Sequence, residues 1–176
     1  MDIEIILIIT IVAIGLVIYL NKKNAFSNSN GKIPSKYAKF DDIVKHIQEF
    51  KPIRNENLKE GYTEKSIENQ LYKYLQQIYV SVTPQYGIEG KNGRNIDLDV
   101  ADGVAGVEIK IASKLFKSAE HDRLNGQLRS YLKARYKENN LILLVCGTKE
   151  DSCNTILHEV KETCRELSVK YIFSEI

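Results

Sequence analysis

The sequence predicts an α/β domain in which helices cover a mixed β-sheet, preceded by a single transmembrane helix. Segments with helical spacing of apolar residues alternate with strand-like segments through most of the chain. Two neighbouring strand-like segments are joined by a short turn, which predicts a hairpin. The continuous apolar run at 141–146 is typical of a strand that is covered on both faces. The order helix, hairpin, helix, buried strand, helix, strand therefore indicates a mixed sheet sandwiched by helices.

The composition is that of a globular protein, with 43% hydrophobic and 27% charged residues in 176. The net charge of +2 is too small to indicate nucleic acid by itself, so evidence for such a partner must come from local features. The three cysteines, Cys146, Cys153 and Cys164, form no Cys-x-x-Cys pair. We expect reduced thiols in a cytosolic setting, without a disulfide framework or a zinc site.

The first apolar segment has the composition of a membrane anchor. Residues 5–20 carry no charge and have nearly the length that a bilayer crossing requires. A signal peptide would begin with positive charge, whereas Asp2 and Glu4 stand at the start and Lys22 and Lys23 follow the apolar segment. A buried core helix would present a polar face, which this segment lacks. We therefore expect a retained single-pass anchor, with the C-terminal domain placed in the cytoplasm by the two lysines.

These features divide the chain into three parts. Residues 1–20 are predicted to form the transmembrane anchor. Residues 21–35 are rich in Asn, Ser, Lys and Gly and predict a flexible linker. Residues 36–176 then form one folded domain, whose core spans about 63–173.

Four helices are predicted from apolar residues at positions i, i+3, i+4 and i+7. They span about 36–50, 63–79, 118–139 and 151–167. Thr63 is a suitable N-cap for the second helix. The remaining strand-like segments outside the hairpin are 79–83, 86–88, 141–146 and 169–173, and Pro84 separates the first two.

The hairpin from Asn95 to Ala112 carries acids on one face, because strand side chains alternate. The first arm places three apolar residues opposite two acids: Ile96, Leu98 and Val100 against Asp97 and Asp99. The second arm continues this arrangement: Val107, Ile109 and Ile111 against Glu108 and Lys110. Asp102-Gly103 supplies the turn. If the arms pair, the carboxylates and the lysine converge on one patch.

Clustered carboxylates on a covered face require a compensating cation. Mg²⁺ takes oxygen ligands, often one or two carboxylates together with substrate phosphates. A neighbouring lysine can hold or deprotonate an attacking water, which suggests metal-assisted attack on a phosphodiester. Glu-x-Lys alone is weak evidence, since the chain contains four such tripeptides. Only Glu108 to Lys110 lies in an apolar strand.

Two polar residues flank the hairpin on the adjacent helices. Glu68 sits at the edge of the apolar stripe of the second helix, where it either reaches a cleft or only complements the helix N-terminus. Gln127 lies on the same helical face as Leu124, where it is either a core amide or a cleft residue.

Together, Asp97, Glu108-Ile109-Lys110, Glu68 and Gln127 resemble the signature of the PD-(D/E)xK nuclease superfamily. The restriction-endonuclease-like core of this superfamily consists of a helix, three antiparallel strands, a crossing helix and a further strand. The resemblance covers about residues 63–173. Residue 96 is Ile where the family name has Pro, a proline that is commonly absent.

The resemblance implies a metal-dependent endonuclease that hydrolyses DNA, with Mg²⁺ or Mn²⁺ as cofactor and a possible homodimer. Asp97 and Glu108 would bind the metal, with help from Glu68. Lys110 would place the nucleophilic water, and Gln127 would orient Lys110 or the phosphate. The alternative is a catalytically inactive module of the same fold that binds nucleic acid or a protein at the membrane.

Two questions stay open at this stage. Asp99 competes with Asp97 for the metal-ligand role, and Asp97 is preferred because the family acid usually precedes the apolar stretch that leads to the turn. Several basic residues follow the hairpin and either neutralise phosphates or only form a solvated helix face. They are Lys114, Lys117, Arg123, Arg129, Lys133, Arg135 and Lys137.

Overall fold

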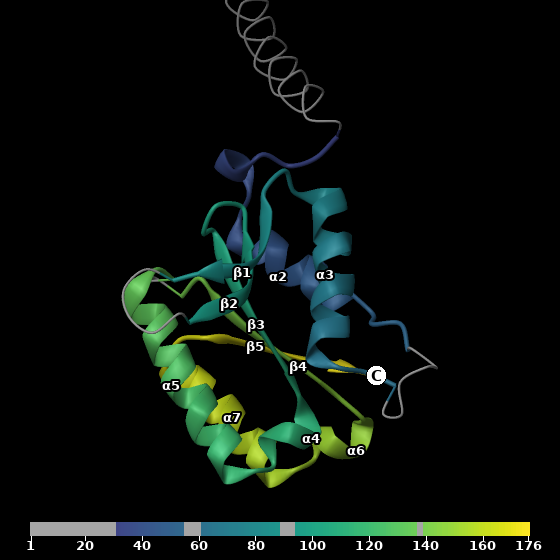
Figure 1. Cartoon of the computed structure of the whole chain (residues 1–176), viewed down its shortest axis with the longest axis vertical. Helices are drawn as coiled ribbons and strands as arrows, with labels where there is room; N and C mark the ends of the chain where they lie inside the picture. Colours follow the sequence, from purple (N-terminus) through teal and green to yellow (C-terminus); the bar gives the residue numbers. More distant parts are fainter. Residues whose placement is uncertain (1–30, 55–60, 89–93, 137–138) are drawn as a thin grey trace, which may run out of the picture.

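The computed structural model describes residues 31–54, 61–88, 94–136 and 139–176 (Figure 1). A short 3₁₀ helix, η1, spans Ser35–Tyr37. The helices are α2 (Phe40–Glu49), α3 (Glu64–Ile78), α4 (Ala112–Leu115), α5 (Ser118–Ala134), α6 (Lys149–Ser152) and α7 (Thr155–Glu166). The strands are β1 (Val82–Gly87), β2 (Asn95–Val100), β3 (Ala105–Ile111), β4 (Leu141–Gly147) and β5 (Lys170–Glu175).

The five strands form one mixed sheet in the order β1-β2-β3-β4-β5. β1, β2 and β3 pair in antiparallel fashion, whereas β3, β4 and β5 are parallel. The predicted α/β class, with a mixed sheet and helices, is confirmed. The hairpin that carries the acids contributes β2 and β3, so β3 stands at the centre of the sheet.

Helices cover both faces of the sheet (Figure 1). On one face, α2 and α3 enclose a core with Leu98, Val107 and Ile109. On the other face, α4, α5 and α7 enclose a second core with Leu143 and Val145. Every residue of β3 is buried as a result, including its acid and its lysine.

The four predicted helical segments are present, but three of them were predicted with the wrong extent. The expected 36–50 helix is divided into η1 and α2. The expected 118–139 helix ends at Ala134, because the chain turns there and returns Arg135 and Tyr136 to β2. The expected 151–167 helix is divided into α6 and α7, because Asn154 caps a new N-terminus and accepts a hydrogen bond from Ile156 N at 2.9 Å.

The predicted break at Pro84 was also wrong, because β1 runs continuously through this proline. β1 is the edge strand of the sheet, so Pro84 pairs with Leu98 without having to supply an N–H to another neighbour.

The side-chain alternation of β2 changes at Asp97, which the sequence pattern did not predict. Leu98 and Val100 enter the first core as expected, but Ile96 enters the second core, on the opposite side of the sheet. Opposite this change in β1, Gln85 has φ of 50°, an uncommon conformation for a residue with a side chain. As a result, Asp97 and Asp99 do not project from the same face of the sheet.

The predicted anchor at 1–20 and most of the linker lie outside the described residues. Among those that are described, no helix has the length and hydropathy that a membrane crossing requires. The end of the predicted linker is held against the domain: Ile33 N donates to Ile78 O at 2.7 Å, and Ser35 Oγ donates to Asp102 at 2.6 Å. The folded part therefore begins before residue 36.

Candidate active site

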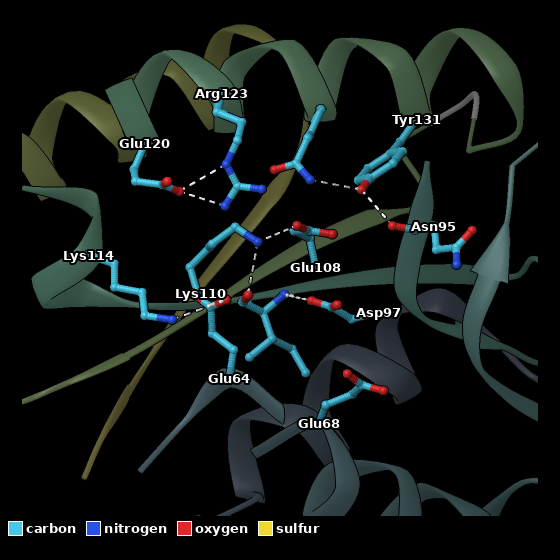
Figure 2. A network of polar contacts seen from close by, with 12 residues as sticks. Glu64, Glu68, Asn95, Asp97, Glu108, Lys110, Lys114, Glu120, Arg123 and Tyr131 are labelled. Carbon is cyan, nitrogen blue, oxygen red and sulfur yellow. Dashed lines mark hydrogen bonds and ion pairs between the residues drawn. The ribbon is translucent and has the colours of Figure 1, made fainter. Parts of the chain in front are cut away.

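Glu108 and Lys110 form a buried ion pair at the centre of the sheet. Alternation in β3 puts both side chains on the α5 side, where Glu108 is 2% exposed and Lys110 is 5% exposed. Lys110 Nζ donates to Glu108 Oε1 and also to the Ile109 carbonyl at 3.2 Å. Figure 2 shows this pair between the helix that carries Arg123 and Tyr131 and the helix that carries Glu64 and Glu68.

Burial changes the pKa values of both members of this pair. It raises the pKa of Glu108 to about 7, against the opposing effect of Lys110 and with a further increase from Asp97. Burial also lowers the pKa of Lys110, but the Glu108 carboxylate more than offsets this effect, so the net shift is upward. Lys110 is thus a cation at neutral pH, suited to holding a water or an anion instead of removing a proton.

Asp97 lies beside the pair and is fixed by the neighbouring strands. Its Oδ2 accepts the Ile109 N–H at 2.7 Å, which replaces a backbone bond between β2 and β3. Its Oδ1 accepts from Gln85 Nε2 at 3.2 Å. Burial raises the pKa of Asp97, with opposition from Lys110 and the Ile109 N–H. The Asp97 carboxylate is therefore held next to β3 at the level of Glu108 and Lys110.

Glu68 enters the site from α3 and is joined to Asp97 through one amide. The Glu68 residue is 3% exposed, so its carboxylate lies inside the structure and not in open water. Its Oε1 accepts from Lys65 Nζ at 2.6 Å, and its Oε2 accepts from Gln85 Nε2 at 2.8 Å. The same Gln85 nitrogen therefore bridges the carboxylates of Glu68 and Asp97.

Gln85 is a site residue that the sequence reasoning missed. It contacts Glu68 and Asp97 from a position in β1 with φ of 50°, and no motif in the sequence marks that conformation. In the sequence, the feature that distinguishes Gln85 is that it directly follows Pro84.

Gln127 is connected to the site through Tyr131, one turn later on α5. Gln127 Nε2 donates to Tyr131 Oη at 3.4 Å, and Tyr131 Oη donates to the Asn95 carbonyl at 2.9 Å. Burial and the nearby Glu108 carboxylate raise the pKa of Tyr131. Tyr131 thus links Gln127 to the start of β2.

Asp99 is separated from these residues by its own partners. It is 1% exposed and accepts from Tyr136 Oη at 2.5 Å and from Arg135 Nε at 3.2 Å. Arg135 also lies over the Tyr86 ring, 4.4 Å from its centroid. Among the described residues, the hydrogen bonds to the Asp99 carboxylate come from Arg135 and Tyr136, just after α5. Asp97 is therefore the acid of β2 that belongs with Glu108 and Lys110.

The donor set fits a divalent cation at two carboxylates. Glu108 Oε2 and Gln127 Oε1 are buried and accept no hydrogen bond from any described residue. A buried acceptor without a donor is unfavourable unless a cation or water completes it. Within the described ranges, no three side chains from His, Cys, Asp and Glu lie close enough to form a metal-binding group. Asp97 and Glu108 alone supply the one or two carboxylates that Mg²⁺ commonly takes.

In comparisons with known proteins, the chain matches no family model, no curated protein and no solved structure. The assignment of function therefore depends on the residues and their geometry.

Proposed function

We propose that the protein is a metal-dependent endonuclease that hydrolyses DNA phosphodiester bonds, tethered to the membrane through residues 5–20 and facing the cytoplasm. The observation that carries this proposal is the buried Glu108–Lys110 pair beside Asp97, with one carboxylate oxygen of Glu108 left without a donor. A buried acid–base pair with an unsatisfied acceptor costs stability, and a catalytic role explains why it is kept.

The order of elements around the pair supports a restriction-endonuclease-like core. α3, the antiparallel strands β1 to β3, the helix α5 and the strand β4 follow one another in the order of the PD-(D/E)xK superfamily. The acids and the lysine occupy β2 and β3 in this order, as in the signature.

In this proposal, Asp97 and Glu108 would hold Mg²⁺ or Mn²⁺, with Glu68 assisting from α3. Such a cation supplies charge stabilisation at the phosphoryl oxygens and increases the acidity of a bound water. Lys110, as a cation, would orient the attacking water and stabilise negative charge on the phosphate. Gln127 would orient Lys110 by accepting a hydrogen bond at its free Oε1, or the phosphate by donating an amide N–H.

The reaction exchanges one bond at phosphorus for another. The water oxygen bonds to phosphorus while the bond from phosphorus to the leaving ester oxygen breaks. The water loses one proton, and the leaving oxygen takes one up. The residues of this chain contribute by fixing the water and by offsetting charge in a site where burial strengthens electrostatic interactions.

The test is a cleavage assay on the full-length chain, purified in a mild detergent, across duplex, branched and single-stranded DNA and RNA. We expect cleavage of DNA with Mg²⁺ or Mn²⁺ and none in EDTA. Lys110→Ala should lower the rate by at least about 100-fold, because it removes a charge that acts in the transition state. Circular dichroism should show an unchanged fold.

Lys161→Ala is the matched control, since Lys161 belongs to another Glu-x-Lys tripeptide but is exposed on α7. Its rate should equal that of the unmodified chain. No cleavage of any substrate with either metal would refute the enzyme and favour the alternative, a catalytically inactive module that binds nucleic acid or a protein at the membrane.

A further inference from the structure

Four charged side chains surround Lys110 and form two ion pairs. Lys114 Nζ of α4 lies 3.7 Å from Glu64 Oε2 of α3. On α5, Arg123 Nη2 lies 2.6 Å from Glu120 Oε2, and Arg123 Nε donates to the same oxygen at 2.9 Å. Figure 2 shows both pairs grouped around Lys110. Each pair therefore joins one cation and one acid at the rim of the candidate active site.

The charges of the rim and of the site act on one another. Glu64 contributes to the raised pKa of Lys110, and Glu108 contributes to the raised pKa of Arg123. Of the basic residues that the sequence offered for phosphate binding, Arg123 thus lies within electrostatic reach of Glu108, and Lys114 pairs with Glu64, whose carboxylate acts on Lys110. Arg135 is instead held by Asp99 at the other end of α5.

Exposure separates the rim pairs from the central pair. The side chains of Lys114 and Arg123 are 50% and 52% exposed, whereas that of Lys110 is 6% exposed. Half-exposed ion pairs are weak because water and salt screen them. A phosphate group can therefore replace the carboxylate at each rim cation at little cost.

The acids of the rim are favoured at their positions independently of the cations. Glu64 is the first residue of α3, and its Oε1 accepts the Ile111 N–H at 3.4 Å. Glu120 lies in the first turn of α5, where a negative charge is favourable. Both acids can remain in place while the longer cationic side chains move to a ligand.

We propose that Lys114 and Arg123 bind two backbone phosphates of a nucleic acid, and that Glu64 and Glu120 hold these cations while the site is empty. This inference rests on the proposed function, since it identifies the groups that would grip the substrate of the same site. Each acid is a competitor of the phosphate, so its removal strengthens binding.

The test is binding of a fluorescent 20-bp DNA duplex to the full-length chain in EDTA, measured by anisotropy over a series of KCl concentrations. Arg123→Gln and Lys114→Gln should each reduce the slope of log K against log salt by about 0.9 and weaken binding roughly fivefold at 0.15 M salt. Glu120→Gln and Glu64→Gln should each tighten binding by a few-fold, because their cations are released.

α7 offers a control of the same geometry. Arg165 Nη2 lies 2.6 Å from Glu162 Oε2, also three residues apart on a helix. Arg165→Gln and Glu162→Gln should leave the affinity and the salt slope unchanged. A purely structural role for Glu120 would lower the melting temperature of Glu120→Gln without tightening binding, and that outcome overturns the inference.

The two proposals fail in different ways. If the duplex binds with the expected slopes but no metal supports cleavage, the rim assignment stands and the endonuclease does not. If DNA is cleaved but the slopes of Arg123→Gln and Lys114→Gln equal that of the unmodified chain, the endonuclease stands and the rim assignment is refuted. Absence of any duplex binding by the unmodified chain also refutes the rim assignment.

Discussion

Two buried acidic clusters occupy the same hairpin and differ in how completely their hydrogen bonds are satisfied. The Asp99 cluster consists of Asp99, Arg135 and Tyr136, and the Glu108 cluster consists of Asp97, Glu108 and Lys110. In the Asp99 cluster, Oδ1 receives the Tyr136 hydroxyl and Arg135 Nε, and Oδ2 receives Arg135 Nη2 at 3.4 Å. In the Glu108 cluster, Glu108 Oε2 receives no donor from the described residues.

This difference separates a structural role from a functional one. Buried charges are tolerated when their hydrogen bonds are satisfied, and both carboxylate oxygens of Asp99 have donors. Gly106 makes this possible, because a Cβ at this position would lie 2.6 Å from the Tyr136 ring that covers Asp99. The Glu108 cluster keeps an acceptor free and raises the pKa of its acid, features that favour ligand binding over stability.

The largest expected effect is a pH dependence of stability that belongs to Glu108. Its folded pKa of about 7 lies above the ordinary value of 4.5. The stabilising contribution is therefore fully present below pH 4.5 and is lost as pH rises through 7. Relative to Glu108→Gln, the unmodified chain should lose up to about 3 kcal/mol of unfolding free energy over this range. Urea unfolding of both proteins in EDTA at pH 5 to 8 measures this difference in unfolding free energy.

Asp99→Asn is the control for this pH dependence. It changes a buried acid of the same hairpin but leaves Glu108 in place, so the loss of stability with rising pH should persist. Parallel curves for the unmodified chain and Glu108→Gln would show that Glu108 is not the group responsible.

The second effect concerns stability at fixed pH. Asp99→Asn should lower the free energy of unfolding by about 2 kcal/mol, because Arg135 and Tyr136 lose a charged acceptor. Asp97→Asn should lower it by less than about 1 kcal/mol, because an amide oxygen can still accept the Ile109 N–H. Denaturant unfolding at pH 7 compares the two variants. Equal losses would remove the structural distinction between the two acids.

Local patterns in the sequence predicted much of the fold. The capping side chain of Thr63 and the apolar period after it marked α3, and the continuous apolar run marked β4 as a covered strand. Alternation in β3 correctly put Glu108 and Lys110 on one face. These features depend on residues within one or two turns or strands of each other, so a single sequence contains the necessary information.

The partners of the acids could not be predicted in this way. In a regularly alternating strand, Asp97 and Asp99 would share one face. The change in alternation at Asp97 separates them. That change lies opposite Gln85 of the neighbouring strand, whose φ is 50°. The end of α5 depends on the hydrogen bonds of Arg135 to Asp99, 36 residues away. Such long-range contacts override the periodicity that favoured a longer helix.

The smallest expected effects come from the two tyrosines of the clusters. Tyr136→Phe should lower the free energy of unfolding by about 1 kcal/mol through loss of one hydrogen bond, with no change in the cleavage rate. Tyr131→Phe should cost a similar amount of stability and also lower the cleavage rate roughly fivefold, because Gln127 loses its acceptor. Denaturant unfolding and the DNA cleavage assay measure the two quantities on the same preparations. Equal cleavage rates in both variants would exclude Tyr131 from the site. A slower rate in Tyr131→Phe alone would show that, of two tyrosines five residues apart, Tyr131 serves the active site and Tyr136 serves only stability.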